Sequence, residues 1–565
     1  MNKCIMKIDV LLCLFLSLAF IASPYYIKNG SCQFDSVYFG SVLFLFLFLL
    51  GCSAIIRRAI FLYYSMSLKN KLDNNRSKLV HICNYLFYSK WALLKITLVI
   101  FICWLPILIV LYPGTLINDT WGQLQQFIEF TNDGTLHRNV LSDHHPFFDT
   151  FLIGSFIIPL TKITGTWHIA IFSYVIIQAI ITSFVFAYSI LYVYHKLKIG
   201  NEFSISILIV YCIFPIYAAS VQTVSKDALF SWGYVLFFLC FMEIIRTKGL
   251  ILREKRFFIK FILIVLFCIL TKKVGIYVIA ISMLALLVAK IINKKRIVIC
   301  LLITLCAIGV ILPGIRHALG ISSGGLQEMF SIPFQQTARY VKYYPNDITP
   351  KERAAIDKVL DFNNLPYRYE PISADPVKGY SQKGTKKDYF IYLETWISQG
   401  IRHPNVYINA YNAMVSGWFS FYEYKPLMDM AWHNQLNPDM IPAWVPERNN
   451  FSEMTATIYQ NLFDNLFNIP FFTIFLCYGF YASIVPAFML GTVIRKHKKK
   501  DIQYWLPAIP MIVSIVLGCW LAPVSIHFEG RRYLYPLVYT FPLIISWCLF
   551  VYKNESEKLE REYYE

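Results

Sequence analysis

The sequence predicts an all-α polytopic membrane protein with about twelve transmembrane helices and an α-rich mixed extracytoplasmic domain. Three observations predict this fold. The 565-residue chain is 57% hydrophobic and only 15% charged, whereas soluble domains carry roughly a quarter charged residues. Apolar runs of about 20 residues, the length that crosses a hydrocarbon core, recur along the chain. Basic residues cluster beside these runs, which is typical of cytoplasmic loops.

Residues 1–112 are expected to form the first three transmembrane helices, near 8–27, 37–56 and 93–112. Lys3 and Lys7, before the first apolar run, resemble the start of a signal peptide. Because the run continues to Ile27 and a second crossing follows at once, we expect a retained helix.

The basic residues indicate which side of the membrane each loop occupies. Loop 57–91 contains seven Lys and Arg against one acidic residue, so we place it in the cytoplasm. Residues 113–165 are predicted to form a first large outer loop, because 113–146 contains one arginine and four acidic residues. The apolar stretch 147–163 is at the lower length limit for a span. The following loops fall on the sides of the membrane that their charges indicate only if this stretch does not cross. We therefore expect an interfacial helix there.

The rest of the chain divides at one long hydrophilic stretch. Residues 166–313 are predicted to form six transmembrane helices, near 166–194, 203–223, 228–246, 257–271, 274–290 and 298–313. Residues 314–467 are the extracytoplasmic domain. Residues 468–552 are predicted to form the last three helices, near 469–492, 503–522 and 533–552, before a cytoplasmic tail at 553–565. This arrangement puts the basic clusters at 57–91, 246–256, 290–296 and 495–500 on the cytoplasmic side.

The extracytoplasmic domain is predicted to be mixed helix and loop. Thr349 followed by Pro350 indicates a helix start, and 390–396 and 406–419 are also expected to be helical. The stretch 363–387 is rich in Pro and Gly and predicts a loop. The domain contains no cysteine, so disulfide bonds do not stabilise it.

The net charge of +18 raises the question of a nucleic-acid partner. The basic residues flank apolar segments, however, and no pattern for base readout is present. We therefore expect no nucleic-acid partner, and we interpret the charge as orienting the chain in the membrane. The spacing of cysteine and histidine residues indicates no zinc site.

Asp119, directly after the third predicted crossing, is the candidate catalytic residue. Leu124, Phe127 and Ile128 follow at helical spacing, so Asp119 opens a short helix at the membrane surface. The ordinary interpretation is an N-cap. The functional interpretation is a carboxylate at the lipid–water boundary that takes a proton from an acceptor hydroxyl.

A second candidate is the segment Asp143-His144-His145-Pro146, which opens the predicted interfacial helix. Two histidines beside an acidic residue can bind phosphate or a metal ion, or can be polar cover at a headgroup boundary. We treat His144 and His145 as candidate substrate-binding residues that support the site at Asp119.

Paired charges stand at the predicted outer ends of other helices. These pairs are Lys226-Asp227, Lys272-Lys273 and Arg531-Arg532. The ordinary explanation for the basic residues is snorkelling to lipid phosphates, and Asp227 would then simply neutralise Lys226. Because cationic pairs are uncommon on the outer side, we interpret them as a ring that binds a phosphate-bearing lipid substrate.

Several longer segments follow one another in a fixed order. Asp119 is followed by HHPFFDTFLIGSFIIPLTKITG, LTKKVGIYVIA and RRYLYPLVYTFPL. These segments resemble the GT-C glycosyltransferase superfamily, which includes the protein O-mannosyltransferases and the lipid A aminoarabinose transferases. A bacterial membrane family of unknown function with that architecture is more similar still, through YPGTLINDTWGQLQQ, SKDALF, SIPFQQTAR and WISQGIRHPNVYINA. The resemblance covers most of the chain from residue 112 onward.

The resemblance implies a GT-C-like fold and an inverting transferase in the cell membrane. It would move a sugar from a polyprenyl-phosphate donor to a cell-envelope glycan or lipid acceptor outside the cell. Asp119 would match the catalytic carboxylate, and the pairs at 272–273 and 531–532 would lie near the lipid-linked phosphate. The resemblance implies no fixed cofactor. A divalent metal stays open, although Asn118 stands where the superfamily often has a second acid.

Two other functions stay open from the sequence. A lipid or solute transporter usually shows internal repeats and broken helices, and the sequence indicates neither. A polysaccharide polymerase or ligase shares a large outer loop but uses a diphosphate-linked glycan donor.

Overall fold

The computed structural model of the chain consists almost wholly of helices. The described residues are 3–69, 78–132, 136–379, 384–421, 468–495, 502–521 and 530–564, with 454, 457, 458, 461, 462 and 465. Eight helices among them are long and apolar enough to cross a bilayer. The chain is therefore an all-α membrane protein with several spanning helices, as predicted.

The helices up to the end of the first half have the following bounds. They are α1 (Lys3–Asn29), α2 (Ser36–Lys69), α3 (Lys78–Phe87), α4 (Ala92–Val110), α5 (Asn118–Phe130), α6 (Phe147–Thr164), α7 (Trp167–Tyr192), α8 (Asn201–Ile213), α9 (Pro215–Val221), α10 (Lys226–Arg246), α11 (Lys255–Thr271) and α12 (Lys273–Val288). The two strands are β1 (Thr115–Leu116) and β2 (Thr223–Val224).

In the described ranges of the second half the elements are helices. They are α13 (Lys294–Cys306), α14 (Leu312–Leu319), α15 (Ser331–Tyr343), α16 (Pro350–Asp357), α17 (Leu365–Arg368), α18 (Asp375–Lys378), α19 (Lys386–Arg402), α20 (Pro404–Val415), α22 (Pro470–Leu476), α23 (Val485–Arg495), α24 (Ala508–Ile515) and α25 (Tyr535–Tyr564). Short 3₁₀ or π turns join several of them.

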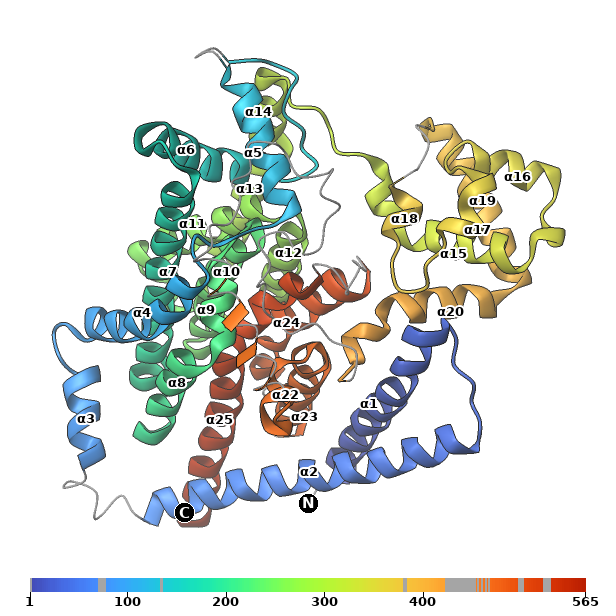
Figure 1. Ribbon diagram of the computed structural model, residues 1–565. Coiled ribbons are helices and arrows are strands. Elements are labelled where there is room, and N and C mark those ends of the chain that lie inside the picture. The colour runs from blue at the N-terminus through green and yellow to red at the C-terminus, as the bar shows by residue number, and fades with distance from the viewer. Residues whose placement is uncertain are drawn as a thin grey trace.

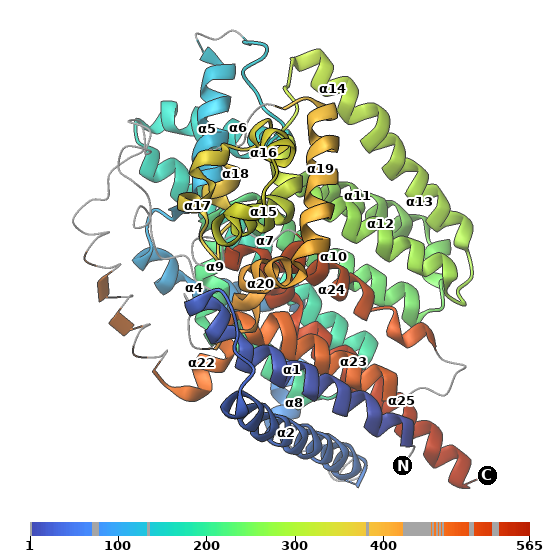
Figure 2. The same ribbon diagram turned by 90° about the vertical axis from the view of Figure 1, so that its right-hand side faces the viewer.

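Most of the long apolar helices gather into one bundle, in which α10 packs against α7, α11 and α25. Helix α2 lies across one end of this bundle in Figure 1, and both chain ends lie near that end in Figure 1 and Figure 2. Helices α5 and α6 lie at the opposite end, where α6 crosses the end of α7 and packs on it (Figure 1). We call this the site end.

The twelve predicted spans are not all confirmed in the described part of the chain. Eight described helices pass the length and hydropathy test, or nine if α8 and α9 count as one span. These two helices are bent by 53° where Pro215, which lacks a backbone N–H, begins α9. Other expected crossings are shorter helices, for example α12. Helix α6, predicted to be interfacial, is one of the eight by length and composition.

The predicted extracytoplasmic domain contains a helical lobe beside the bundle, formed by α15–α19 (Figure 1). The lobe has its own apolar core, which includes Phe334, Ile356 and Tyr392. It begins later than the predicted residue 314, because the helix through α14 continues to Leu319. Residues 422–453 of the predicted domain lie outside the described part.

The helices of the lobe largely confirm the prediction. Thr349 caps α16 and forms a capping box with Glu352, and the two predicted helical stretches fall in α19 and in α20 with the turn that follows it. The predicted loop contains two one-turn helices, α17 and α18, which makes that part of the prediction wrong. Both have Pro in their first turn, where a missing N–H costs no hydrogen bond.

Candidate functional site

Two short parallel strands bring the starts of α5 and α10 together. Strand β1 pairs with β2 so that Thr115 lies opposite Thr223. Each helix begins two residues after its strand, so both helices start on the same side of the strand pair. The hydroxyl of Thr120 donates to the carbonyl oxygen of Val224 at 2.5 Å and ties the first turn of α5 to β2.

The close approach of β1 to its neighbours requires a glycine. Gly114 has a φ of +114°, and a Cβ atom there would lie 2.6 Å from Val175 and 3.0 Å from the carbonyl oxygen of Gln222. An L side chain would meet both a strained backbone and a steric clash. This geometry explains why a glycine stands at position 114 in the segment YPGTLINDT.

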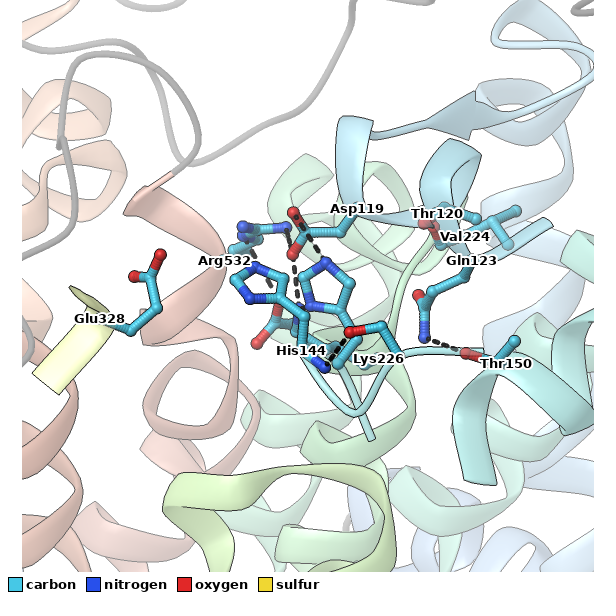
Figure 3. Close-up of polar contacts among 12 residues, drawn as sticks. Asp119, Thr120, Gln123, His144, Thr150, Val224, Lys226, Glu328 and Arg532 are labelled. Atoms are coloured by element: carbon cyan, nitrogen blue, oxygen red, sulfur yellow. Dashed lines mark hydrogen bonds and ion pairs between the residues drawn. The ribbon is translucent and has the colours of Figure 1, made fainter. Parts of the chain in front are cut away.

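Asp119 lies in the first turn of α5, and its carboxylate faces three nitrogen-bearing side chains (Figure 3). Its Oδ2 atom lies 2.5 Å from Lys226 Nζ and 2.9 Å from an Arg532 guanidinium nitrogen, and its Oδ1 atom lies 3.7 Å from His145 Nε2. The N-cap of α5 is Ile117, which makes no side-chain capping bond. The N-cap interpretation of Asp119 is therefore wrong.

Asp227 is the second carboxylate that contacts cationic side chains at this site. Its Oδ1 atom lies 2.6 Å from Lys272 Nζ, and its Oδ2 atom lies 3.4 Å from Arg532 Nε. Asp227 does not pair with Lys226, its neighbour in the sequence, so the interpretation of this pair as self-neutralising is wrong. Arg532 instead bridges the two carboxylates.

We name these five side chains, Asp119, Asp227, Lys226, Lys272 and Arg532, the charge cluster. Four of the five side chains are at most 11% exposed, and that of Asp119 is 19% exposed. Three cations stand against two carboxylates, which leaves one positive charge in excess. A buried excess of positive charge at a membrane boundary is suited to an anionic ligand.

Local structure explains how these side chains are presented. Ser225 caps α10 by accepting a hydrogen bond from the backbone N–H of Ala228, which places Lys226 and Asp227 in its first turn. Lys272 is the single extended residue between α11 and α12, and its Nζ atom lies 4.4 Å from the ring centroid of Tyr533. The tight link turns the side chain of Lys272 into the bundle.

The two histidines of the HHP segment lie next to the charge cluster. His145 Nδ1 lies 2.7 Å from Lys226 Nζ, and its ring meets that of His144 edge-on at 4.4 Å. Burial lowers the pKa of His145 to about 3 and also lowers the pKa of His144. His145 is therefore neutral at pH 7, and it can accept a hydrogen bond from the Lys226 ammonium.

The electrostatics of Asp119 are set by its cationic neighbours. Burial alone would raise the pKa of its carboxyl, but Arg532 and Lys226 outweigh burial and hold that pKa well below its usual range. The carboxylate is ionised at neutral pH. In this state it is a weak proton acceptor, because basicity falls with pKa.

The remaining predicted site residues do not all join the cluster. Lys273 lies apart from the charge cluster and contacts Asp143, with Nζ 3.6 Å from Oδ2, so its substrate-binding role stays a prediction. It follows Lys272 at the start of α12, where the side chain points to the surface and is 46% exposed. The side chain of Arg531 lies outside the described part of the chain.

Two carboxyl groups near the cluster were missed in the sequence. Glu328, from the turn before α15, lies closer to Arg532 and His144 than to the other labelled side chains in Figure 3, and it pairs with Lys378 at 2.6 Å. Asp149, in the first turn of α6, is fully buried, and neither of its oxygens has a hydrogen-bond partner. Asp149 could have been found from the sequence, because it is an acidic residue inside the apolar run HHPFFDTF. The sequence around Glu328 has no such feature.

The donor set does not fit a divalent metal. Within the described ranges, no three His, Cys, Asp or Glu side chains are placed to hold one. The carboxylate of Asp119 is engaged by Lys226 and Arg532, whose positive charges would repel a metal ion. We therefore derive no step that uses a metal.

Residues 135–562 match a family described as a family of unknown function, DUF6020. The chain belongs to this family. This agrees with the resemblance of the motifs to a membrane family of unknown function. The matched range includes His145, Lys226, Asp227, Lys272 and Arg532 but begins after Asp119. No curated protein and no solved structure matches the chain.

Proposed function

We propose that the chain is an inverting GT-C-type glycosyltransferase. It moves a sugar from a polyprenyl-phosphate donor in the cell membrane to a cell-envelope glycan or lipid acceptor outside the cell. The observation that carries the proposal is the charge cluster, a buried set of three cations and two carboxylates at the site end of the helices. Its excess positive charge suits a lipid-linked phosphate.

The proposed reaction is a single displacement at the anomeric carbon. The acceptor oxygen forms a bond to that carbon, and its proton moves to the carboxylate of Asp119. The bond between the anomeric carbon and the phosphate oxygen breaks, and its electron pair leaves with the polyprenyl phosphate. Arg532 and Lys272 stabilise the charge that grows on this leaving group. Attack opposite the leaving group inverts the configuration of the sugar.

The donor itself is proposed to activate Asp119. Without a ligand, Lys226 and Arg532 hold the pKa of Asp119 too low for an effective base. A donor phosphate competes with the carboxylate for the same two cations, and each contact that the carboxylate loses raises its pKa. Proton acceptance is thereby restricted to the donor-bound state. In this proposal Glu328, from the turn before α15, contacts the acceptor.

The test is transfer of a labelled sugar from a polyprenyl-phosphate donor by the purified protein in proteoliposomes. We expect Asp119→Asn to lower the rate by about 10²- to 10⁴-fold, the usual contribution of a general base. Glu129→Gln, which changes a more exposed carboxyl at the other end of α5, is the matched control and should keep the parent rate. Undiminished transfer by Asp119→Asn would remove the mechanism.

A lipid transporter is the second candidate, because the structure contains one broken helix. The bent pair α8–α9 leads directly into β2 beside the charge cluster, and broken helices often line transporter sites. Counterflow of labelled lipid without a covalent product would favour this function. A polymerase or ligase would instead require a diphosphate-linked donor in the same assay.

A further inference from the structure

A pocket lies beside the HHP segment, lined by Pro146 and by no residue of the charge cluster. Its volume is about 230 Å³, and it lies between α6, α11, α12 and the helix that ends in α14. Its walls are mostly apolar and include Phe148, Leu270, Ile276 and Ile308. Such a pocket accommodates a hydrocarbon chain rather than a polar ligand.

Three charged side chains line the same pocket. Asp143 Oδ2 lies 2.9 Å from Arg316 and 3.6 Å from Lys273, and Lys273 Nζ also donates to the backbone carbonyl oxygen of Asp143. The side chains of Lys273 and Arg316 are 46% and 34% exposed, so an anion can reach them. Two cations against one carboxylate leave one positive charge at the surface.

The surroundings of the pocket are those of a lipid-facing surface. Tyr277, Ile311 and Ile315, on the helices that form the pocket, are exposed. Lys273 begins α12 and Arg316 lies near the end of the candidate span 294–319, so both cations stand at a boundary of the apolar region. Basic side chains above an apolar pocket between helices form a general binding pattern for anionic lipids.

We propose that this pocket binds an anionic phospholipid of the surrounding leaflet, with its phosphate between Lys273 and Arg316 and part of one acyl chain in the pocket. The site is distinct from the proposed donor site, because no residue of the charge cluster lines it. The proposal does not depend on the proposed transferase activity.

The pocket and the charge cluster share one short segment of chain. Asp143 lies in the pocket, whereas His145, two residues later, contacts Lys226. A phosphate that competes with Asp143 for Arg316 and Lys273 alters the contacts that hold this segment. The bound lipid therefore acts on the position of His145 beside the charge cluster.

The test is native mass spectrometry of the purified full chain with phosphatidylglycerol and, separately, with phosphatidylcholine. We expect one retained phosphatidylglycerol per chain, and roughly tenfold weaker retention in the double variant Lys273→Gln/Arg316→Gln, because two charge-assisted contacts are lost. Lys162→Gln, an exposed lysine at the other end of α6, is the matched control and should bind as the parent does.

Ile276→Phe keeps every charge and fills the pocket, so it separates loss of the ligand from loss of the fold. We expect it also to weaken retention of phosphatidylglycerol. Equal retention of the two lipids, or parent-like retention in both pocket variants, would overturn the proposal. It would also be overturned if a short-chain polyprenyl phosphate displaced phosphatidylglycerol from the parent but not from the double variant, since the pocket would then belong to the donor.

Discussion

Asp149 and Asp227 are both fully buried aspartates at the site end, yet their surroundings differ. Asp227 contacts Lys272 and Arg532, whereas neither oxygen of Asp149 has a hydrogen-bond partner. Burying an ionised carboxylate without donors is costly enough that such a group usually becomes neutral. The two side chains therefore contribute different charges to the same region.

This contrast predicts different effects of one substitution. Asp149→Asn replaces a neutral side chain with another of nearly the same shape, so we expect little loss of stability. Asp227→Asn leaves Lys272 and Arg532 with less compensation, and we expect a loss of about 3 kcal/mol in the free energy of unfolding. Thermal unfolding of both variants in the same detergent measures the difference, and equal destabilisation would argue against a neutral Asp149.

His145 makes stability depend on pH. Burial lowers its pKa to about 3, whereas an unfolded histidine titrates near 6.5. Between these values the unfolded chain binds a proton that the folded chain does not, so stability falls as pH falls through 6.5. Asp119, with its lowered pKa, contributes a further loss of stability only as the pH falls below about 4.

We expect His145 to contribute a fall of about 2 kcal/mol in the free energy of unfolding between pH 6.5 and 5. His145→Gln should therefore flatten the dependence of stability on pH in that interval. The exposed His317 provides the matched control as His317→Gln, which should keep the slope of the parent. Chemical denaturation at stepwise pH measures both slopes, and the prediction fails if they agree.

At the scale of elements, the strand pair β1–β2 sets the distance between the starts of α5 and α10. Gly114→Ala would place a Cβ atom 2.6 Å from Val175. We therefore expect a loss of stability and a larger loss of the proposed transfer activity, because Asp119 would shift from Lys226. Gly122→Ala is the matched control, since no atom lies within 4 Å of its Cβ position.

Gly122 lies inside α5, where alanine is favoured over glycine by about 1 kcal/mol. The control variant should thus be as stable as the parent or slightly more stable. Thermal unfolding and the proteoliposome assay together provide the comparison. Equal behaviour of the two alanine variants would show that the strand pair does not position Asp119.

The local elements could be predicted because their signals lie within a few residues of each other. The helix that begins near Asp119 and the helix capped by Thr349 follow from spacing and capping alone. The pairing of Asp119 with Lys226 could not be predicted, because it depends on a strand pair between segments more than 100 residues apart. Nothing in a two-residue strand marks it in the sequence.

At the scale of the whole molecule, the orientation in the membrane stays a prediction and can be measured directly. Tyr367 is 88% exposed in the lobe, and Leu250 is 52% exposed in the turn after α10, at the opposite end of the bundle. We expect an impermeant maleimide to label Tyr367→Cys but not Leu250→Cys in intact cells. The parent chain shows the labelling of native cysteines, and the reverse pattern would place the charge cluster in the cytoplasm.

The predicted crossings correspond to helices, but their number and limits were only partly predictable. Hydropathy shows where apolar segments lie, and helices such as α4, α7 and α10 agree closely with the expected ranges. Hydropathy alone did not predict the break between α8 and α9, because the chain stays apolar across that break. It also did not predict that α14 extends beyond residue 313, because the chain becomes polar only gradually there. Helix length depends on packing that the local sequence does not specify.

Helix α25 joins the two ends of the molecule without interruption. It begins three residues after Arg532 and continues to Tyr564, a rod of about 45 Å at 1.5 Å per residue. Arg532, just before its first turn, touches both carboxylates of the charge cluster. A small tilt of this helix about its middle would move the guanidinium of Arg532 away from one aspartate and toward the other. A displacement of the far end of the helix would therefore change the balance of charge at the site.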